Sequence, residues 1–369
     1  MNAENEELWS DPEETDHGSM VSMAVPESLH NASVLSDEAE SEDGGSEDSV
    51  LSYNFERDGE RFFVQEEGRR YNKLNRLYPL PADGEEWQRL SDLHEVLKLC
   101  VGGLYQAPIT VDRLLAHAEG EEKHILDCGC GGGEWMIEMA RKFPHAKVVG
   151  VDLAPGLIWE MMPPNCRVEF DDINKPLRHF RGKFDVVHAR SCFLGVDNYE
   201  QFLDRMVQCL KPGGIVLVVE SPLRLTVPED LAINGGNLEA QVIQMFQWAE
   251  DAIEGNGSDV RAIDNLQGLV EEHPLLENKE SFVATVPVGR WGGEHIGGLM
   301  QENFVKLVHA LGPVLLRAGY PAPMVDQWMA SVEGALRSPW ARFTSRWTYC
   351  CASRVLDAEA DEDDGEEGE

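Results

Sequence analysis

The first 50 residues of the sequence contain no lysine or arginine, and they contain 15 acidic residues. Large apolar residues are also few there, so this segment cannot bury enough surface to fold, and we expect residues 1–50 to be a disordered acidic leader. Residues 357–369 contain nine acidic residues and are expected to be a disordered acidic tail. Removing these 24 acids from the formal net charge of −36 leaves −12 for the segment between them. The extreme charge therefore belongs to the two ends.

The chain also has no cluster of lysine and arginine. Because an acidic protein repels phosphate backbones, we expect no direct contact with nucleic acid. The longest apolar runs, such as residues 215–219, are far shorter than the roughly 20 residues of a membrane helix, so no membrane partner is expected. The eight cysteines lie mostly in apolar runs and no secretory leader is visible, which favours reduced thiols. We expect a soluble intracellular protein, cytoplasmic or nuclear.

Short apolar runs alternate with helical patterns over most of the chain. The unbroken apolar run at 215–220, rich in β-branched residues, is typical of a strand buried on both faces. The pattern predicts a Rossmann-like α/β fold with a seven-stranded, mostly parallel sheet flanked by helices. Strands are expected at residues 124–127, 146–152, 166–170, 184–189, 215–220, 282–288 and 347–355. Helices are expected at residues 83–99, 135–143, 199–210, 238–254, 259–271, 302–318 and 324–336.

The same pattern divides the chain into parts. Pro212 with Gly213 and Gly214 is expected to form a turn, because proline ends a helix and glycine permits positive φ. The parts are an acidic leader (1–50), an N-terminal helical cap (51–119), a nucleotide-binding core (120–225), helical additions with the last two strands of the same domain (226–356) and an acidic tail (357–369).

The segment Ile125–Glu134 is the strongest functional signal, because a glycine-rich loop follows a predicted strand and precedes a predicted helix. Glycines let the backbone turn sharply and approach a ligand, and the helix offers free N–H groups. Asp127 ends the strand and could bind an ammonium group or order the turn. Asp152 lies 21 residues after Gly131, at the end of the next strand, where a carboxylate can accept hydrogen bonds from ribose hydroxyls.

Two other interpretations of this loop fit less well. Cys128 and Cys130 lie two residues apart, but without a second pair they make a poor zinc site, so no metal is expected. An NAD-dependent oxidoreductase would prefer glycines spaced G-x-G-x-x-G. Counted from Gly129 and Gly131, the third glycine of that pattern falls on Glu134, and the match fails.

The loop resembles the first motif of class I S-adenosylmethionine-dependent methyltransferases, D-x-G-x-G-x-G. The likeness continues through Asp152, the acidic pair Asp171-Asp172 and the phrase Leu210–Gly214. It implies S-adenosyl-L-methionine as cofactor, with the adenine near Asp172 and the backbone of Ile173 and the methionine end bordered by residues 188–191. The cofactor-binding residues that it implies are Asp127, Gly129, Gly131, Gly133, Asp152, Leu153, Asp172, Ile173 and Arg190.

More narrowly, three phrases resemble the fungal LaeA-like methyltransferases, which are linked to secondary metabolism. They are Tyr78–Asp83 with Glu86, Arg89 and His94 on the following helix, Phe184–Arg190, and Val286–Gly292. The resemblance implies transfer of a methyl group to a small-molecule or protein acceptor. The alternative is a regulatory protein that keeps the fold and acts through protein partners.

Methyl transfer from a sulfonium needs mainly alignment, and sometimes a base. His188 is the candidate base, because it would lie at the carboxyl end of a central strand, although a histidine satisfied by the core is the alternative. Arg190 could clamp a carboxylate or pair with a helix acid. Glu86 and Arg89 could form a surface ion pair or could order Tyr71 or Tyr78 against the substrate. The candidates on the substrate side are Tyr71, Tyr78, Glu86 and Trp291, the last lining an apolar pocket.

Overall fold

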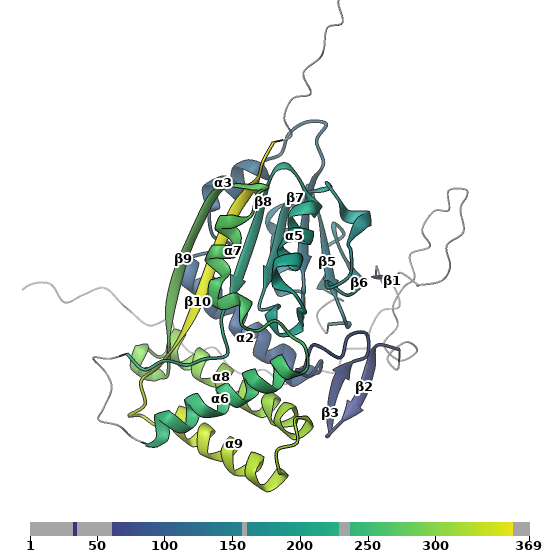
Figure 1. Cartoon of the computed structure of the whole chain (residues 1–369). Helices are drawn as coiled ribbons and strands as arrows, with labels where there is room; N and C mark the ends of the chain where they lie inside the picture. The colour runs from purple at the N-terminus through teal and green to yellow at the C-terminus, as the bar shows by residue number, and fades with distance from the viewer. Residues whose placement is uncertain (1–31, 35–60, 157–160, 229–236, 357–369) are drawn as a thin grey trace, which may run out of the picture.

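The computed structural model describes residues 32–34, 61–156, 161–228 and 237–356 (Figure 1). Its main sheet has the order β1-β6-β5-β4-β7-β8-β10-β9. The six strands from β1 to β8 in this order pair parallel with one another, whereas β10 is antiparallel to both β8 and β9. The strands are β1 (Ala32–Val34), β4 (Lys123–Cys128), β5 (Ala146–Asp152), β6 (Cys166–Phe170), β7 (Phe184–Arg190), β8 (Leu210–Glu220), β9 (Leu276–Val288) and β10 (Phe343–Arg354).

The seven predicted strands are present, so the prediction of a mostly parallel Rossmann-like sheet is confirmed. The additional strand β1 is three residues long and comes from the segment that we expected to be an acidic leader. The rest of that segment and the acidic tail 357–369 lie outside the described residues.

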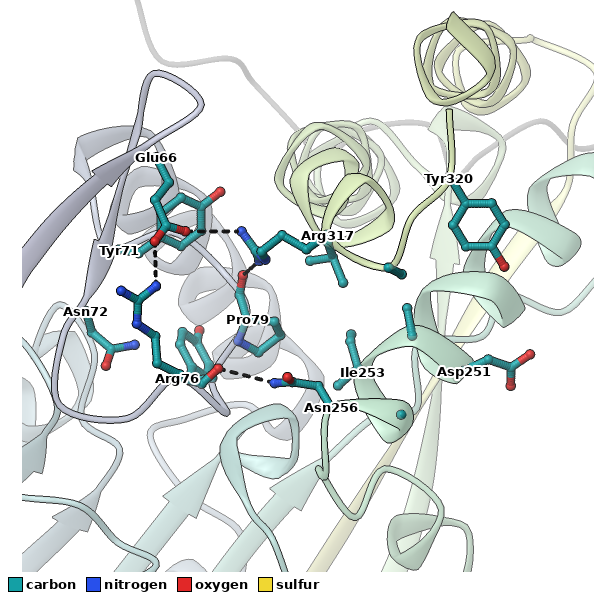
Figure 2. Close-up of a pocket in the computed structure, with 15 residues that line it drawn as sticks. Glu66, Tyr71, Asn72, Arg76, Pro79, Asp251, Ile253, Asn256, Arg317 and Tyr320 are labelled. Atoms are coloured by element: carbon teal, nitrogen blue, oxygen red, sulfur yellow. Dashed lines mark hydrogen bonds and ion pairs between the residues drawn. The ribbon is translucent and has the colours of Figure 1, made fainter. Parts of the chain in front are cut away.

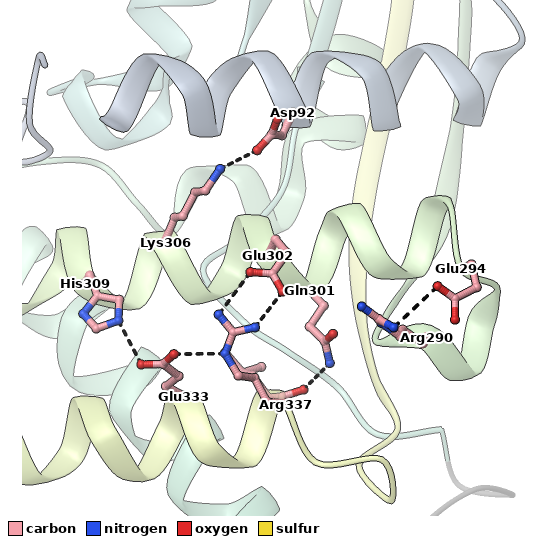
Figure 3. Close-up of polar contacts among 10 residues, drawn as sticks. Asp92, Arg290, Glu294, Gln301, Glu302, Lys306, His309, Glu333 and Arg337 are labelled. Carbon is pink, nitrogen blue, oxygen red and sulfur yellow. Dashed lines mark hydrogen bonds and ion pairs between the residues drawn. The ribbon is translucent and has the colours of Figure 1, made fainter. Parts of the chain in front are cut away.

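Helices cover both faces of the sheet, and α6, α8 and α9 gather beyond one end of it (Figure 1). Arg337, which directly follows α9, lies 3.1 Å or less from both carboxylate oxygens of Glu302 on α8 (Figure 3). Lys306 of α8 is 2.6 Å from Asp92 and so links α8 to α2. The helices are α2 (Gly84–Val101), α3 (Pro108–Leu114), α4 (Glu134–Lys142), α5 (Tyr199–Cys209), α6 (Asn237–Gly255), α7 (Leu266–Glu272), α8 (Ile296–Arg317) and α9 (Ala322–Leu336). In the described part of the chain, no helix is both long and apolar enough to span a membrane.

The N-terminal cap contains the expected helix α2 and also a hairpin that the sequence analysis did not predict. Strands β2 (Phe63–Glu66) and β3 (Arg69–Asn72) pair antiparallel. Glu67 and Gly68 form the two-residue turn between them, with φ of 49° and 75°. Positive φ at both central residues is the geometry of a tight hairpin turn, but the usual signal for it is asparagine or aspartate before glycine. Because glutamate precedes Gly68 here, the sequence did not indicate this turn.

The hairpin is tied to the start of α2. Asp83 caps this helix by accepting a hydrogen bond of 3.2 Å from the backbone N–H of Glu86. The Asp83 carboxylate also binds Arg69 of β3 with both oxygens, at 2.6 and 2.9 Å. An aspartate at the cap satisfies N–H groups that a helix leaves free, and here it orients the hairpin as well.

Several boundaries differ from the sequence-based ones. Strand β8 begins at Leu210, so the turn that we expected at residues 212–214 is instead part of the strand. The strand is irregular there, because its pairing with β7 shifts in register between Phe184 and Val186. Gly213 there has φ of 76°, which explains the turn-like sequence. The helix expected at 259–271 is a short 3-10 turn, Ala262–Asn265, followed by α7. Strand β9 and helix α8 each begin earlier than expected.

Candidate cofactor and active site

The glycine-rich loop joins β4 to α4 at the carboxyl edge of the sheet. Gly129, Gly131 and Gly133 all have positive φ, at 68°, 57° and 95°. A Cβ on Gly129 would lie 2.6 Å from the Sγ atom of Cys192, so a side chain there requires the Cys192 side chain in the loop after β7 to move. The backbone N–H groups of Gly129 and Cys130 donate to the carbonyl of Val151 at 2.8 and 3.1 Å. The loop is therefore held tightly against the end of β5.

Asp152 at the end of β5 reaches back to this loop. Its Oδ2 atom accepts a hydrogen bond of 2.8 Å from the backbone N–H of Gly131, and its Oδ1 atom accepts one of 3.2 Å from Ala154. Burial raises the pKa of Asp152 to about 6, although these backbone donors oppose the shift. The structure thus brings Asp152 into contact with the glycine-rich loop, as the spacing of the two in the sequence indicated.

Two cavities open beside the loop, and Leu90, Gly129 and Gly131 line both of them. The first, which we call the adenosine-side cavity, is lined by the predicted residues Asp152, Leu153, Asp172 and Ile173, together with Asn72, Tyr78 and Trp87. The second, the methionine-side cavity, is lined by Asp127, Glu134, Trp135, His188 and Arg190. The remaining predicted residue, Gly133, caps α4 with φ of 95°. The predicted cofactor residues therefore converge on one edge of the sheet.

Asp127 and His188 lie side by side on β4 and β7. The Nδ1 atom of His188 is 2.7 Å from the Oδ1 atom of Asp127, and both side chains are buried. The imidazole also stacks on the indole of Trp135, with ring centroids 3.8 Å apart and an angle of 11° between the planes. Burial lowers the pKa of His188, so the neutral ring donates from Nδ1 to the carboxylate. This geometry suits a residue that positions Asp127 better than it suits a free base.

Arg190 ends β7 at the methionine-side cavity. Its Nη2 atom is 2.9 Å from the Nδ1 atom of His94 on α2, and the Nε2 atom of His94 is 3.1 Å from Glu138. Burial lowers the pKa of His94 to about 3, so the ring is neutral and accepts the hydrogen bond from Arg190. Among the described residues, no carboxylate oxygen lies within 4.0 Å of the Arg190 guanidinium. Arg190 therefore forms no direct ion pair with a helix acid there, although the charges of Asp127 and Glu134 act on it across the same cavity.

A group next to this site has the geometry of a metal site. In the described part of the chain, His94, Glu95 and Glu138 place their ligand atoms within 4.8 Å of one another. The Nζ atom of Lys98, however, is 3.1 Å from Glu95 and 3.0 Å from Glu138. Lys98 therefore already pairs with both carboxylates of this group.

Glu86 and Arg89 form a buried ion pair, so the interpretation as a surface pair is wrong. Both side chains are at most 6% exposed, and their two hydrogen bonds measure 2.6 and 2.9 Å. Arg89 also donates to the Oδ1 atom of Asn303 on α8 at 3.3 Å, and Asn303 donates back to the Arg89 carbonyl at 2.8 Å. The pair fastens α2 to α8, and the charges of both residues act on Tyr78.

Trp291, expected on the substrate side, lies elsewhere. Its ring lines a separate cavity with Arg337 and Arg342, and no residue of that cavity lines either cofactor-side cavity. The indole N–H donates to the carbonyl of Val288 at 3.2 Å, and the Arg342 guanidinium lies 5.9 Å from the ring centroid. These contacts hold Trp291 at the end of β9, away from the glycine loop.

Sequence reasoning missed several residues of the site. Asn75 donates to Asp172 at 3.2 Å, and Glu220 on β8 accepts from the backbone N–H of Cys192 and from the hydroxyl of Tyr199, both at 2.9 Å. Burial raises the pKa of Glu220 to about 8. Glu220 thereby holds the loop after β7 against the glycine loop. The available signal was its position, an acid at the carboxyl end of an otherwise apolar strand.

Comparisons with known proteins agree with this geometry. Residues 105–273 match a methyltransferase domain family. The secondary metabolism regulator laeA of Coprinopsis cinerea is 31% identical over 306 residues, which cover 80% of this chain and 75% of that protein. The methyltransferase pytC of Aspergillus terreus is 29% identical, over 66% of this chain and 72% of that protein.

A solved structure is also similar in part. Phosphoethanolamine N-methyltransferase 2 of Haemonchus contortus, in complex with S-adenosyl-L-methionine, aligns over 81% of this chain and 73% of that chain, with 14% identity and a TM-score of 0.40. The 31% identity to the Coprinopsis cinerea protein over most of both chains, together with the matching methyltransferase domain, shows that the chain belongs to the LaeA-like methyltransferases.

Proposed function

We propose that this chain is an active methyltransferase that binds S-adenosyl-L-methionine across the adenosine-side and methionine-side cavities and methylates an acceptor of fungal secondary metabolism. The convergence of Asp127, Asp152 and Arg190 on the glycine loop carries this proposal. The relatives named as a secondary metabolism regulator and as methyltransferases support the biological context.

Each end of the cofactor would find complementary groups in the two cavities. Asp152 would accept hydrogen bonds from the ribose hydroxyls, while Asp172 and Ile173 would border the adenine. Asp127 would face the ammonium group of the methionine part, and the guanidinium of Arg190 would pair with the carboxylate of the same part. The bound cofactor supplies an activated methyl group, so the protein contributes mainly alignment and exclusion of water.

The direct test is isothermal titration calorimetry of the full chain with S-adenosylhomocysteine, with NAD as the comparison ligand. We expect saturable binding of one equivalent of S-adenosylhomocysteine and none of NAD. A chain that is folded by circular dichroism and yet binds no S-adenosylhomocysteine contradicts the proposal.

The substitution Arg190→Gln is expected to weaken S-adenosylhomocysteine binding about 10- to 150-fold, since a hydrogen bond to a charged group contributes roughly 1.5–3 kcal/mol. Glutamine keeps a donor for His94 but removes the charge. Calorimetry measures the loss. Adenosine, which has no carboxylate, should bind the wild type and the variant equally, and an equal loss for both ligands would place Arg190 outside the carboxylate site.

Binding of the cofactor product should depend on pH through Asp152. The pKa of this group is about 6, so its carboxylate protonates as the pH falls through 6 and loses its capacity to accept from both ribose hydroxyls. We expect the Kd of S-adenosylhomocysteine to rise about tenfold between pH 7 and pH 5. In Asp152→Asn the affinity should be low at both values and nearly independent of pH. A wild-type Kd that is equal at both values excludes this role of Asp152.

A second candidate function is suggested by the relatives that are named as regulators. In that case the fold and cofactor site would serve assembly with protein partners, and catalysis would be dispensable. Gly131→Arg separates the two functions when it is introduced into cells of the source organism. Loss of cofactor binding together with an unchanged phenotype favours the regulatory function, and loss of both favours the enzyme.

A further inference from the structure

A cavity of about 660 Å³ lies between the hairpin region of the cap and helices α6 and α8 (Figure 2). We call it the hairpin cavity. Its volume lies within the roughly 300–1,000 Å³ that is usual for small-molecule sites. The cap contributes Glu66, Tyr71 and Arg76 to its wall, and the helices contribute Ile253 and Arg317. It is far larger than a gap left by imperfect packing.

The hairpin cavity adjoins the adenosine-side cavity, because Asn72 and Tyr78 line both. The ring of Tyr78 packs against Gly195 in the loop after β7, where an added Cβ would lie 3.1 Å from the ring. The carboxylate of Asp152 acts on the Tyr78 hydroxyl, and burial raises the pKa of that hydroxyl far above its usual value. One neutral aromatic ring thus stands between the hairpin cavity and the cofactor site.

The charged groups that line the hairpin cavity are already paired. Glu66 pairs with Arg76 and lies 3.8 Å from Arg317 (Figure 2). Asp251 is 2.8 Å from Arg261. Arg317 also donates to the carbonyl of Pro79 at 2.8 Å. Because each of these charges has an opposite charge nearby, the cavity does not require an ionic ligand.

Aromatic rings also line the cavity, with two polar groups that have no hydrogen-bond partner among the described residues, the Tyr71 hydroxyl and the Asn72 amide nitrogen. Tyr71, Tyr78 and Tyr320 line the cavity. Behind it, Tyr320 packs against Trp328 with ring centroids 5.5 Å apart. Asn72 is 3% exposed, and its Oδ1 atom accepts from a backbone N–H, but among the described residues its Nδ2 atom has no hydrogen-bond partner. Buried amide donors are nearly always paired, so this one indicates a ligand that offers an acceptor oxygen.

From these observations we infer that the hairpin cavity binds the methyl acceptor, and that this acceptor is a neutral aromatic molecule with a hydroxyl group. The inference rests on the proposed function. In the transfer, the bond between the methyl carbon and the sulfonium breaks, a bond from this carbon to the acceptor oxygen forms, and S-adenosylhomocysteine leaves as a neutral thioether. The hydroxyl proton passes to solvent at the open end of the cavity, where Arg76 is 65% exposed.

Binding of 2-naphthol tests this inference. Saturation-transfer difference NMR on the full chain with bound S-adenosylhomocysteine is expected to show 2-naphthol binding. Ala318→Trp introduces a large ring at an exposed position of the cavity wall, and Ala252→Leu narrows the wall on α6. Both should weaken 2-naphthol binding at least about tenfold. Ala116→Trp is the matched control, because Ala116 is exposed and lines none of the cavities described above.

Calorimetry with S-adenosylhomocysteine on the same samples separates the two proposals. If S-adenosylhomocysteine binds all variants alike and only Ala318→Trp and Ala252→Leu lose 2-naphthol, the acceptor site is supported. The inference is overturned, while the proposed function stands, in two cases in which S-adenosylhomocysteine binds. In the first, 2-naphthol does not bind the wild type, and in the second, 2-naphthol binds every variant equally. A chain that binds no S-adenosylhomocysteine contradicts both.

Discussion

Gly131→Arg is expected to weaken S-adenosylhomocysteine binding at least about 100-fold, as measured by calorimetry on the full chain. Gly131 lines both cofactor-side cavities, and its φ of 57° lies in the left-handed region. Its Cβ position is 3.5 Å from Leu90, so the first carbon fits but the remaining side chain must enter the cavities. A guanidinium there would also sit beside the site that we assign to the ammonium group.

Gly120→Arg is the matched control for this experiment. Gly120 also has positive φ, at 82°, and no atom lies within 4 Å of its Cβ position. This variant therefore carries comparable backbone strain, roughly 1–2 kcal/mol, without obstructing a cavity. It should bind S-adenosylhomocysteine like the wild type, and urea denaturation should show that both variants are folded. If Gly131→Arg binds within threefold of the wild type, the cofactor does not lie against this loop.

The parallel part of the sheet was predictable because each of its strands and turns is indicated by a short stretch of the sequence. Each strand is a short apolar run, and each glycine with positive φ occupies a turn that few other residues can make. Asp152 was also predictable, since its distance along the chain from Gly131 follows from the length of one helix and one strand. The hydrogen bond of 2.8 Å between these two residues is the physical result of that spacing.

The pairings around the site were not predictable, because they join distant parts of the chain. Asp127 and His188 meet only because β4 and β7 are neighbours in register. Arg190 reaches His94 because α2 lies over the carboxyl ends of the strands. The hairpin cavity likewise forms between the cap and helices that begin more than 150 residues later. The sequence periodicity of a single segment gives no information about contacts between distant segments.

Arg89→Met is expected to destabilise the protein by about 3–5 kcal/mol, the usual cost of removing one partner from a buried ion pair. Glu86 is 2% exposed and would keep its carboxylate in the core without the two hydrogen bonds from Arg89. The contact from Arg89 to Asn303 on α8 would be lost as well. Urea denaturation followed by circular dichroism measures the change in the free energy of unfolding.

Two companion variants locate the origin of this cost. Arg290→Met removes the same side chain from an exposed pair, Arg290 with Glu294 at 3.7 Å, and should change the free energy of unfolding by less than about 1 kcal/mol (Figure 3). The double variant Glu86→Leu/Arg89→Met removes both buried charges and should recover most of the lost stability, since an apolar pair leaves no carboxylate without a partner. If the double variant is instead as unstable as Arg89→Met, the cost lies in the lost side-chain contact from Arg89 to Asn303, because that contact is absent from both variants.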